Sequence, residues 1–247
     1  MNFTKKTVLV LVLISALVFS SFAILAQDGS DQKGNSEQQP TIVATVNGEK
    51  ITQQELSQST QVYQIIMTLS QQYRTFAQFL MTSESGSKFL TEYRKYVLDQ
   101  LITQNLRAQQ IEKMGITVPD DEVQTEIDNI IENNKQFKDE KALEDYLKNN
   151  QNMTMDNLES MIRDNLKVQK LKEEVSKDVS VSEEEIQEFY NNNKESYKDD
   201  EGNVKPLEEV REQITNSLMN QKQNESYNNW LEKVKESAEI EKKEENI

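Results

Sequence analysis

The chain has 247 residues, of which 35% are hydrophobic, and a formal net charge of −15 at pH 7. It contains no histidine and no cysteine, which excludes thiolate nucleophiles, histidine general bases, disulfides and the usual zinc ligand sets. The acidic excess disfavours nucleic-acid binding through phosphate neutralisation. With only 6 glycines and 3 prolines, the composition favours a mainly helical protein.

The N-terminal segment, residues 1–26, has the layout of a secretory signal. A short basic start precedes an apolar run over residues 7–25, and small residues follow it. The run also reaches the lower length limit for crossing a bilayer, roughly 17 residues. We expect either a signal peptide cleaved after Ala23 or Ala26, or a retained signal anchor, with the remainder outside the cell membrane. Residues 27–40 have no large apolar side chain and predict a disordered linker.

A β-hairpin is predicted at the start of the folded part, in "TIVATVNGEKIT". Ile42, Ala44 and Val46 alternate along one face, and Asn47-Gly48 is the strongest short hairpin signal. We therefore expect two short strands joined by a tight turn.

Two long helices should follow the hairpin. Thr52 and Glu55 form a capping box, so a helix starts there and extends to about Leu80, where "TSESGS" interrupts it. Apolar residues then recur at steps of three or four from Leu90 onward, which predicts a second helix that stops at Gly115.

The middle of the chain predicts a lobe of shorter helices. One starts with Pro119 in its first turn, another is capped near Asp139, and the longest covers residues 155–175. Ser182 and Glu185 make a further capping box.

The C-terminal part predicts a long closing helix from Leu207 to beyond Val234 and a last short strand at residues 237–241. Short strands at both ends cannot satisfy their backbone groups alone, so this strand should pair with the N-terminal hairpin. The fold class is therefore mainly α, with a short N-terminal β-hairpin paired to a C-terminal strand. The expected domains are a core of residues 41–119 with 205–241, a helical lobe of residues 120–204 and a charged, frayed tail of residues 242–247.

Four segments occur in a characteristic order: "VNGEKITQQEL", "LDQLITQNLRAQQIEKMGITVPDDEV", "VSEEEIQEFYNNNKESY" and "PLEEVREQITNSLMNQKQNESYNNWLEKVKESAEIE". Behind a signal-like N-terminus, this order resembles the chaperone part of the SurA/PrsA family of exported foldases. The resemblance covers nearly all of residues 41–241 and implies a helical chaperone domain like the SurA N-terminal domain.

In that family a parvulin prolyl-isomerase domain usually follows the helix with the "EFY" motif. Here only the turn "KDDEGNVK" separates Tyr197 from Pro206, so the comparison implies that the catalytic insert is absent. Parvulin active sites resemble one another in using paired histidines beside an acid or a cysteine, and this sequence has neither histidine nor cysteine. We assign no catalytic residue, no metal ligand and no cofactor.

Apolar residues of the first helix and methionines of the middle lobe are the candidate contacts for a bound polypeptide, because thioether and aromatic side chains adapt to different partners. Core packing is the alternative for each of them. "FAQFLM" at residues 76–81 is favoured, since its apolar side chains occupy more than one helical face. The candidates are Met67, Tyr73, Phe76, Phe79, Leu80, Met81, Met153, Met155 and Met161.

The resulting hypothesis is an exported, extracytoplasmic holdase-type chaperone. It would hold unfolded or newly exported polypeptides in an apolar cleft between the first helices and the middle lobe. The alternatives are a degenerate parvulin-type prolyl isomerase and a dedicated envelope adaptor with one native partner. We expect no nucleic-acid partner, contact with the membrane only through an uncleaved N-terminal segment, and a homodimer as an open possibility.

Overall fold

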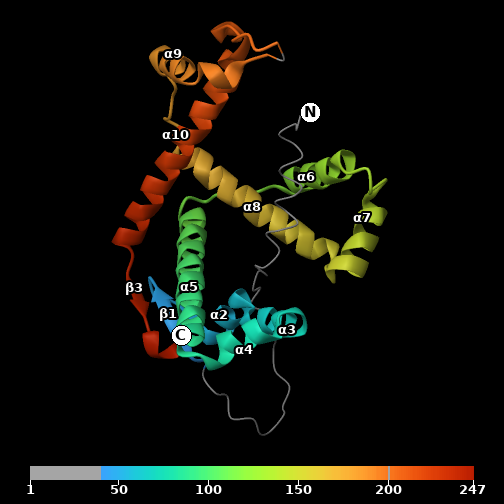
Figure 1. The fold of residues 1–247 in the computed structure, drawn as a ribbon, viewed down its shortest axis with the longest axis vertical. Helices are drawn as coiled ribbons and strands as arrows, with labels where there is room; N and C mark the ends of the chain where they lie inside the picture. Colours follow the sequence, from blue (N-terminus) through green and yellow to red (C-terminus); the bar gives the residue numbers. More distant parts are fainter. Residues whose placement is uncertain (1–39, 200) are drawn as a thin grey trace. The chain divides into compact units, whose positions relative to one another are not determined.

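A computed structural model describes residues 40–199 and 201–247 (Figure 1). The expected signal segment and all of the expected linker except Pro40 lie outside the described residues. The described chain forms two compact units: the part up to Lys167 together with Ala238–Ile247, and Val168–Ser237. The domain boundaries expected from the sequence remain a prediction.

The first unit contains a three-stranded antiparallel sheet in the order β2-β1-β3 (Figure 1). Its strands are β1 (Ile42–Val46), β2 (Glu49–Thr52) and β3 (Ile240–Lys242). Asn47 and Gly48 both have positive φ, at 52° and 86°, as a tight hairpin turn requires. The hairpin and its pairing with a C-terminal strand are therefore confirmed, but the strand lies at Ile240–Lys242 instead of residues 237–241, because α10 continues to Ser237.

Strand β1 departs from the predicted simple alternation. A register shift between Ile42 and Ala44 interrupts its pairing with β2. As a result Val43 is fully buried together with Ala44 and Val46, while Ile42 is half-buried. An irregularity of this kind re-aims side chains locally, so three residues of a five-residue strand are buried in the core.

The segment predicted as one helix after the hairpin is three helices: α2 (Gln53–Thr60), α3 (Val62–Gln72) and α4 (Arg74–Thr82). The prediction of continuity was wrong. Gln61 takes the left-handed conformation, with φ 49°, and Tyr73 leaves the helical region at φ −134° and ψ 57°. Neither position carries glycine or proline, so no local sequence signal marks these breaks. The breaks let α2 pack on α5 while α3 packs on α4.

The predicted capping box at the start of α2 is confirmed. The Glu55 backbone N–H donates to Thr52 Oγ1 over 3.2 Å, and the Thr52 backbone N–H donates to Glu55 Oε2 over 2.6 Å. Helix α5 (Glu84–Lys113) then ends before Gly115, which has φ 64°, as predicted. The predicted interruption "TSESGS" is shorter than expected, because the break is Ser83 alone and α5 begins at the next residue.

Helices α6 (Asp120–Asn133), α7 (Glu140–Tyr146) and α8 (Met155–Val175), with a π-helical turn η1 (Leu147–Gln151), enclose a small core of their own. The bounds of α8 agree with the prediction. Pro119 precedes α6 as its N-cap rather than lying in its first turn, because its ψ of 157° is extended. The buried members of this core are Val118, Val123, Ile127, Phe137, Leu143, Leu147, Leu158 and Ile162.

The second unit contains α9 (Glu183–Asn192), a 3₁₀ turn η2 (Lys194–Tyr197) and α10 (Leu207–Ser237). The Ser182–Glu185 capping box is confirmed. Lys222 of α10 donates to both carboxylate oxygens of Glu185, over 2.7 and 3.0 Å, and this ammonium group lowers the pKa of Glu185. The two helices enclose a core with four buried residues, Ile186, Tyr190, Val210 and Ile214.

The turn between η2 and α10 is organised by Asp199. Its carboxylate accepts hydrogen bonds from the backbone N–H groups of Asn203 and Glu201, over 2.8 and 2.9 Å. The bond from Asn203 is the main reason why the pKa of Asp199 lies below its ordinary value. A bridge between Lys198 and Val204 closes the turn.

We expect Asp199→Asn to lower the melting temperature at neutral pH, because the amide accepts these bonds more weakly than the carboxylate. A carboxyl whose pKa is depressed by folding stabilises the protein above its unfolded pKa of about 3.9, and that contribution is lost as pH falls through the folded pKa. The difference in melting temperature between the two proteins should therefore shrink in acid. A difference that stays constant between neutral pH and pH of about 2 would contradict a role for the charge.

Residues 242–247 are charged, but they pack against the first unit instead of fraying. Lys242 pairs with Asp99 over 2.6 Å, and Glu244 pairs with Lys95 over 2.9 Å. The Asn246 side-chain amide donates to the Ile42 carbonyl over 2.8 Å. These contacts continue the closure that β3 begins.

Candidate functional site

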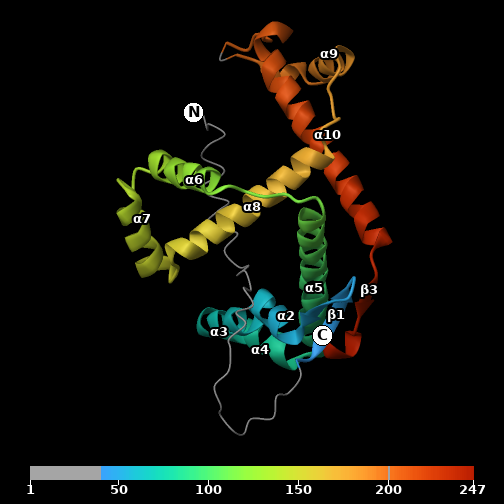
Figure 2. The same ribbon diagram turned by 180° about the vertical axis from the view of Figure 1, so that it is seen from behind.

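Large apolar side chains are exposed in one region of the first unit. Apart from Met114 and Val204, all exposed large apolar residues in the described chain lie between residues 63 and 96. Figure 2 shows α3, α4 and the start of α5, which carry them, close together near α2. We call these residues the α3–α5 apolar set: Tyr63, Ile65, Met67, Tyr73, Phe76, Phe79, Met81, Phe89 and Tyr96.

Helix α3, "VYQIIMTLSQQ", contributes no buried residue at all. A helix on the surface of a globular protein normally buries its apolar face against the core. In α3 the apolar residues are instead exposed or half-buried, with Tyr63 at 74% and Met67 at 47% exposure. The helix also contains no charged residue. Six of its eleven residues are apolar, and exposed apolar side chains gathered on one surface helix are typical of an interaction site.

A close helix–helix corner holds α4 in place. The Ser83 hydroxyl donates to the Phe79 carbonyl over 2.7 Å and accepts from the Gly86 N–H over 2.9 Å. Gly86 is buried, and a Cβ atom placed there would lie 2.4 Å from the Phe79 carbonyl oxygen and 2.5 Å from Leu80 Cα. Glycine is therefore required for α4 to lie directly on α5. This approach buries Ala77 and Leu80 and leaves Phe76 and Phe79 outside, with their rings stacked at 6.4 Å.

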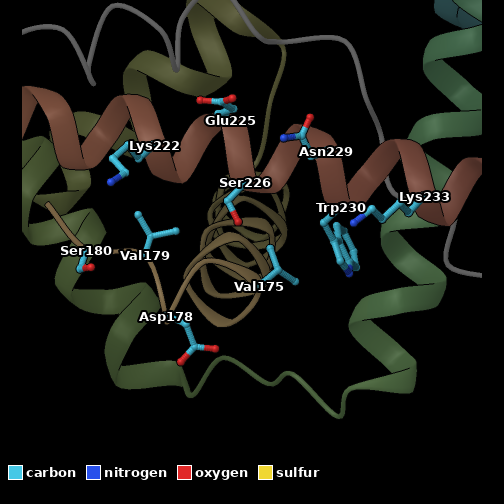
Figure 3. Close-up of a pocket in the computed structure, with 10 residues that line it drawn as sticks. All are labelled: Val175, Asp178, Val179, Ser180, Lys222, Glu225, Ser226, Asn229, Trp230 and Lys233. Atoms are coloured by element: carbon cyan, nitrogen blue, oxygen red, sulfur yellow. The ribbon is translucent and has the colours of Figure 1, made fainter.

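A hollow lies within the second unit, between the segment after α8 and one face of α10 (Figure 3). Its volume is about 660 Å³. Val175, Val179 and Trp230 supply its apolar lining. Lys222, Glu225, Ser226, Asn229 and Lys233 line it along α10, and Asp178 and Ser180 line it from the segment after α8. We call it the Trp230 groove.

Within the described part of the chain, residues 40–199 and 201–247, no three acidic side chains come close enough together to hold a metal ion. No helix within it combines the length and the apolar character needed to cross a membrane. The candidate sites in the described residues are therefore the α3–α5 apolar set and the Trp230 groove.

The sequence was compared with known protein families and with curated proteins. Residues 1–172 match the family described as the SurA-like N-terminal domain. The chain belongs to this family. The matched range includes the hairpin, the whole α3–α5 apolar set and most of α8.

Curated relatives of this SurA-like chain are named as foldases. "Foldase protein PrsA" of Clostridium botulinum strain Hall is 31% identical over 157 residues, which are 63% of this chain and 46% of the relative. "Foldase protein PrsA" of Caldanaerobacter subterraneus subsp. tengcongensis is 30% identical over 186 residues, which are 75% of this chain and 52% of the relative. The chain thus spans about half the length of the curated relatives it matches.

The structure of this SurA-like domain separates the residues predicted as polypeptide contacts. Leu80 is buried at 4% exposure, so its side chain belongs to the packing of α4. Met153 and Met155 are half-buried against the α6–α8 core, and Met161 is also half-buried. The remaining five candidates, Met67, Tyr73, Phe76, Phe79 and Met81, are exposed members of the α3–α5 apolar set. A role in polypeptide binding remains a prediction for all nine.

Four members of this set were not predicted from the sequence: Tyr63, Ile65, Phe89 and Tyr96. Their helical spacing is the spacing of core residues, so exposure could not be recognised from periodicity. A usable signal was the composition of residues 62–82, where Arg74 is the only charged residue and apolar residues occur on several helical faces. The Trp230 groove had no sequence signal, because its two walls are separated in the chain by α9 and the following turn.

We expect Gly86→Ala to reduce the free energy of unfolding by about 1–3 kcal/mol, since an added methyl group in a closely packed site forces neighbouring backbone apart. Denaturant unfolding measures this change. Ser87→Ala is the matched control, because Ser87 is exposed in the same helical turn. Equal stability of Gly86→Ala and Ser87→Ala would contradict the close approach of α4 to α5.

Proposed function

We propose that this chain is an extracytoplasmic holdase-type chaperone that binds unfolded or newly exported polypeptides without catalysing a reaction. The α3–α5 apolar set carries the proposal. Its exposed aromatic and thioether groups offer contacts that any apolar segment of an unfolded chain could use. Membership of a family whose curated relatives are named foldases supports the same conclusion.

The physical character of the set favours weak and tolerant binding. Residues 62–82 carry a single charge, at Arg74, so few fixed charges would select one client sequence over another. The Phe76–Phe79 stack is half-exposed and fixed to α4, which rests on α5 through Gly86. A client would therefore meet rigid aromatic anchors beside adaptable methionine side chains at Met67 and Met81.

A non-catalytic role is supported by the composition. The chain has no histidine and no cysteine, and a short turn closed by Lys198 and Val204 joins η2 to α10. A degenerate prolyl isomerase is the enzymatic alternative. It predicts faster cis–trans conversion of a prolyl peptide when the protein is added, whereas the holdase proposal predicts the uncatalysed rate.

Export is part of the proposal. The basic start and apolar run of residues 1–26 support it, because this is the layout of a secretory signal. Fractionation of cells that express the whole chain tests this point. Recovery outside the cytoplasm is expected, and exclusive recovery in the cytoplasm would contradict it.

The test of holding is aggregation of a chemically unfolded client, followed by light scattering, with residues 27–247 present at near-stoichiometric amount. We expect the protein to suppress scattering. The double variant Phe76→Ser/Phe79→Ser should bind clients about tenfold or more weakly, because exposed aromatic anchors contribute most to such interfaces. Both rings are about half exposed, so the fold should be retained, as circular dichroism would show.

The double variant Met114→Ser/Val204→Ser is the matched control, because both residues are exposed apolar residues outside the α3–α5 apolar set. It should suppress scattering as well as the wild type does. No suppression by the wild type across several clients would favour the dedicated adaptor instead. Equal loss in both double variants would show that the set has no special role.

A further inference from the structure

Helix α3 is held to the rest of the first unit by a narrow contact. It packs against α4, and none of its eleven residues is buried. Val62, Ile66 and Leu69 lie on one helical face and are half-buried, whereas the other eight residues are exposed. Most of the stability of a helix in a protein comes from burying such a face. Helix α3 therefore receives little stability from tertiary packing.

The sequence of α3 adds little stability of its own. Its eleven residues fall short of the roughly 12–15 residues at which an isolated helix becomes even marginally stable in water. Val62, Ile65, Ile66 and Thr68 are β-branched and lose side-chain freedom in a helix. Because α3 has no charged residue, it has no ion pairs between its turns and no charge that favours the dipole at either end.

The two ends of α3 are breaks without side-chain caps, and they lie next to fixed parts of the chain. Gln61 at the N-cap has φ 49° and makes no side-chain cap hydrogen bond, and Tyr73 at the C-cap has φ −134° and ψ 57°. Thr60, just before α3, is buried, and its carbonyl accepts from the Tyr93 hydroxyl over 3.2 Å. Beyond α3, α4 rests on α5 at Gly86. Helix α3 is thus a weak helix between two anchored points.

We infer that α3 opens locally in the free protein and becomes a stable helix when a client covers it, so that client binding is coupled to folding of α3. This inference rests on the proposed function, since it states how the α3–α5 apolar set is regulated. Tyr63, Ile65 and Met67 of that set lie on α3, whereas Phe76 and Phe79 lie on the anchored α4. The cost of ordering α3 reduces the apparent affinity for every client, which keeps holding weak and reversible.

Hydrogen exchange followed by mass spectrometry tests the local opening of α3. The protein is residues 27–247, as in the test of holding, and the client is a small protein kept unfolded by alkylation of its reduced cysteines. In the free protein we expect α3 amides to exchange about a hundredfold or more faster than those of α5, because α3 opens without global unfolding. A client at about ten times its Kd should slow exchange in α3 about tenfold. Equal protection of α3 and α5 in the free protein would overturn the inference.

Two double variants remove the same side chains from α3 and change its helix stability in opposite directions. Thr68 and Ser70 are exposed, and neither belongs to the α3–α5 apolar set. Thr68→Ala/Ser70→Ala favours the helix, and Thr68→Gly/Ser70→Gly disfavours it. The alanine variant should bind the client about tenfold more tightly than the glycine variant, since affinity follows the population of folded α3. Equal affinity of the two variants would contradict coupled folding.

The matched control is the same pair of changes in α5, a helix with five buried residues. Gln100 and Gln104 are exposed there. Gln100→Gly/Gln104→Gly should unfold at clearly lower denaturant concentration than Gln100→Ala/Gln104→Ala, and the two should bind the client equally well. The two α3 variants should instead unfold at nearly the same denaturant concentration, because α3 is already open. A difference between them as large as that of the α5 pair would show that α3 is folded in the free protein and would overturn the inference.

The remaining outcomes separate this inference from the proposed function. Suppressed client aggregation by a protein whose α3 is fully protected would overturn the inference and leave the holdase standing. An open α3 that gains no protection from a client whose aggregation is suppressed would do the same. No suppression by the wild type would contradict the proposed function, and the coupling to clients with it. Protection of α3 that rises with protein concentration without a client would identify a second copy of the chain as its partner and would overturn the inference.

Discussion

Ile102→Ala should lower the free energy of unfolding by about 2–5 kcal/mol, the range for removing a large buried aliphatic side chain. Ile102 is 0% exposed in α5, the helix on which α2, α4 and β1 all pack. The lost free energy combines the transfer of the removed carbons with the cavity left behind. Denaturant unfolding measures the change, with the slope of unfolding free energy against denaturant concentration expected to be the same in both proteins.

Ile65→Ala is the matched control for this prediction, because it makes the same chemical change in a helix without a buried residue. Ile65 is 42% exposed in α3, so its removal should alter stability by no more than about 0.5 kcal/mol. The pair therefore separates residues kept for stability from residues kept for binding. Similar losses at both positions would show that α3 is packed against the core and would remove the main support for the α3–α5 apolar set.

Much of this fold could be predicted from the sequence because the relevant signals are local. The Asn47-Gly48 turn, the Thr52 and Ser182 capping boxes, the Asp139 cap and the Gly115 stop all occur where they were expected. Each of them depends on hydrogen bonds or backbone angles within a few residues. Pairing of β3 with β1 followed from the same reasoning, since an isolated strand leaves its backbone groups unsatisfied.

The breaks at Gln61 and Tyr73 could not be predicted, because their cause lies outside the segment. Residues 53–82 read as one amphipathic helix, yet α2 packs on α5 whereas α3 packs on α4. Gly86 illustrates the same limit. In the sequence it looks like an interruption of a helix, but in the structure it is inside α5 and gives α4 room to approach. Tertiary packing overrides local preference at all three positions.

The candidate site was predicted only in part, because the packing of other elements against a helix cannot be recognised from its own sequence. Periodicity identifies which residues are apolar and share a face, but not whether another element covers that face. Leu80 and Phe79 are neighbours in the sequence with similar apolar character, and the first is 4% exposed while the second is 46% exposed. The difference arises from the position of α4 on α5. A groove whose walls come from α10 and from the segment after α8 has still less local signature.

Glu241→Pro should reduce the free energy of unfolding by on the order of 3 kcal/mol, because it removes a backbone donor from the middle of a strand ladder. The Asn47 N–H donates to the Glu239 carbonyl and the Lys243 N–H donates to the Val43 carbonyl, each over 2.8 Å. Since bonded pairs alternate along antiparallel strands, the backbone of Glu241 faces Thr45 of β1, with which it is paired. Proline there would leave an acceptor of β1 without its partner.

Lys242→Pro makes the same substitution one residue later, where alternation turns the backbone N–H toward the open edge of the sheet. It loses the ion pair with Asp99, but such partly exposed pairs contribute less than about 1 kcal/mol. We therefore expect Glu241→Pro to be clearly the less stable of the two in denaturant unfolding. If closure by β3 is what completes the first unit, Glu241→Pro should also increase hydrogen exchange at β1, whereas Lys242→Pro should not. Equal exchange in the two variants would mean that β1 is held by β2 and α5 alone.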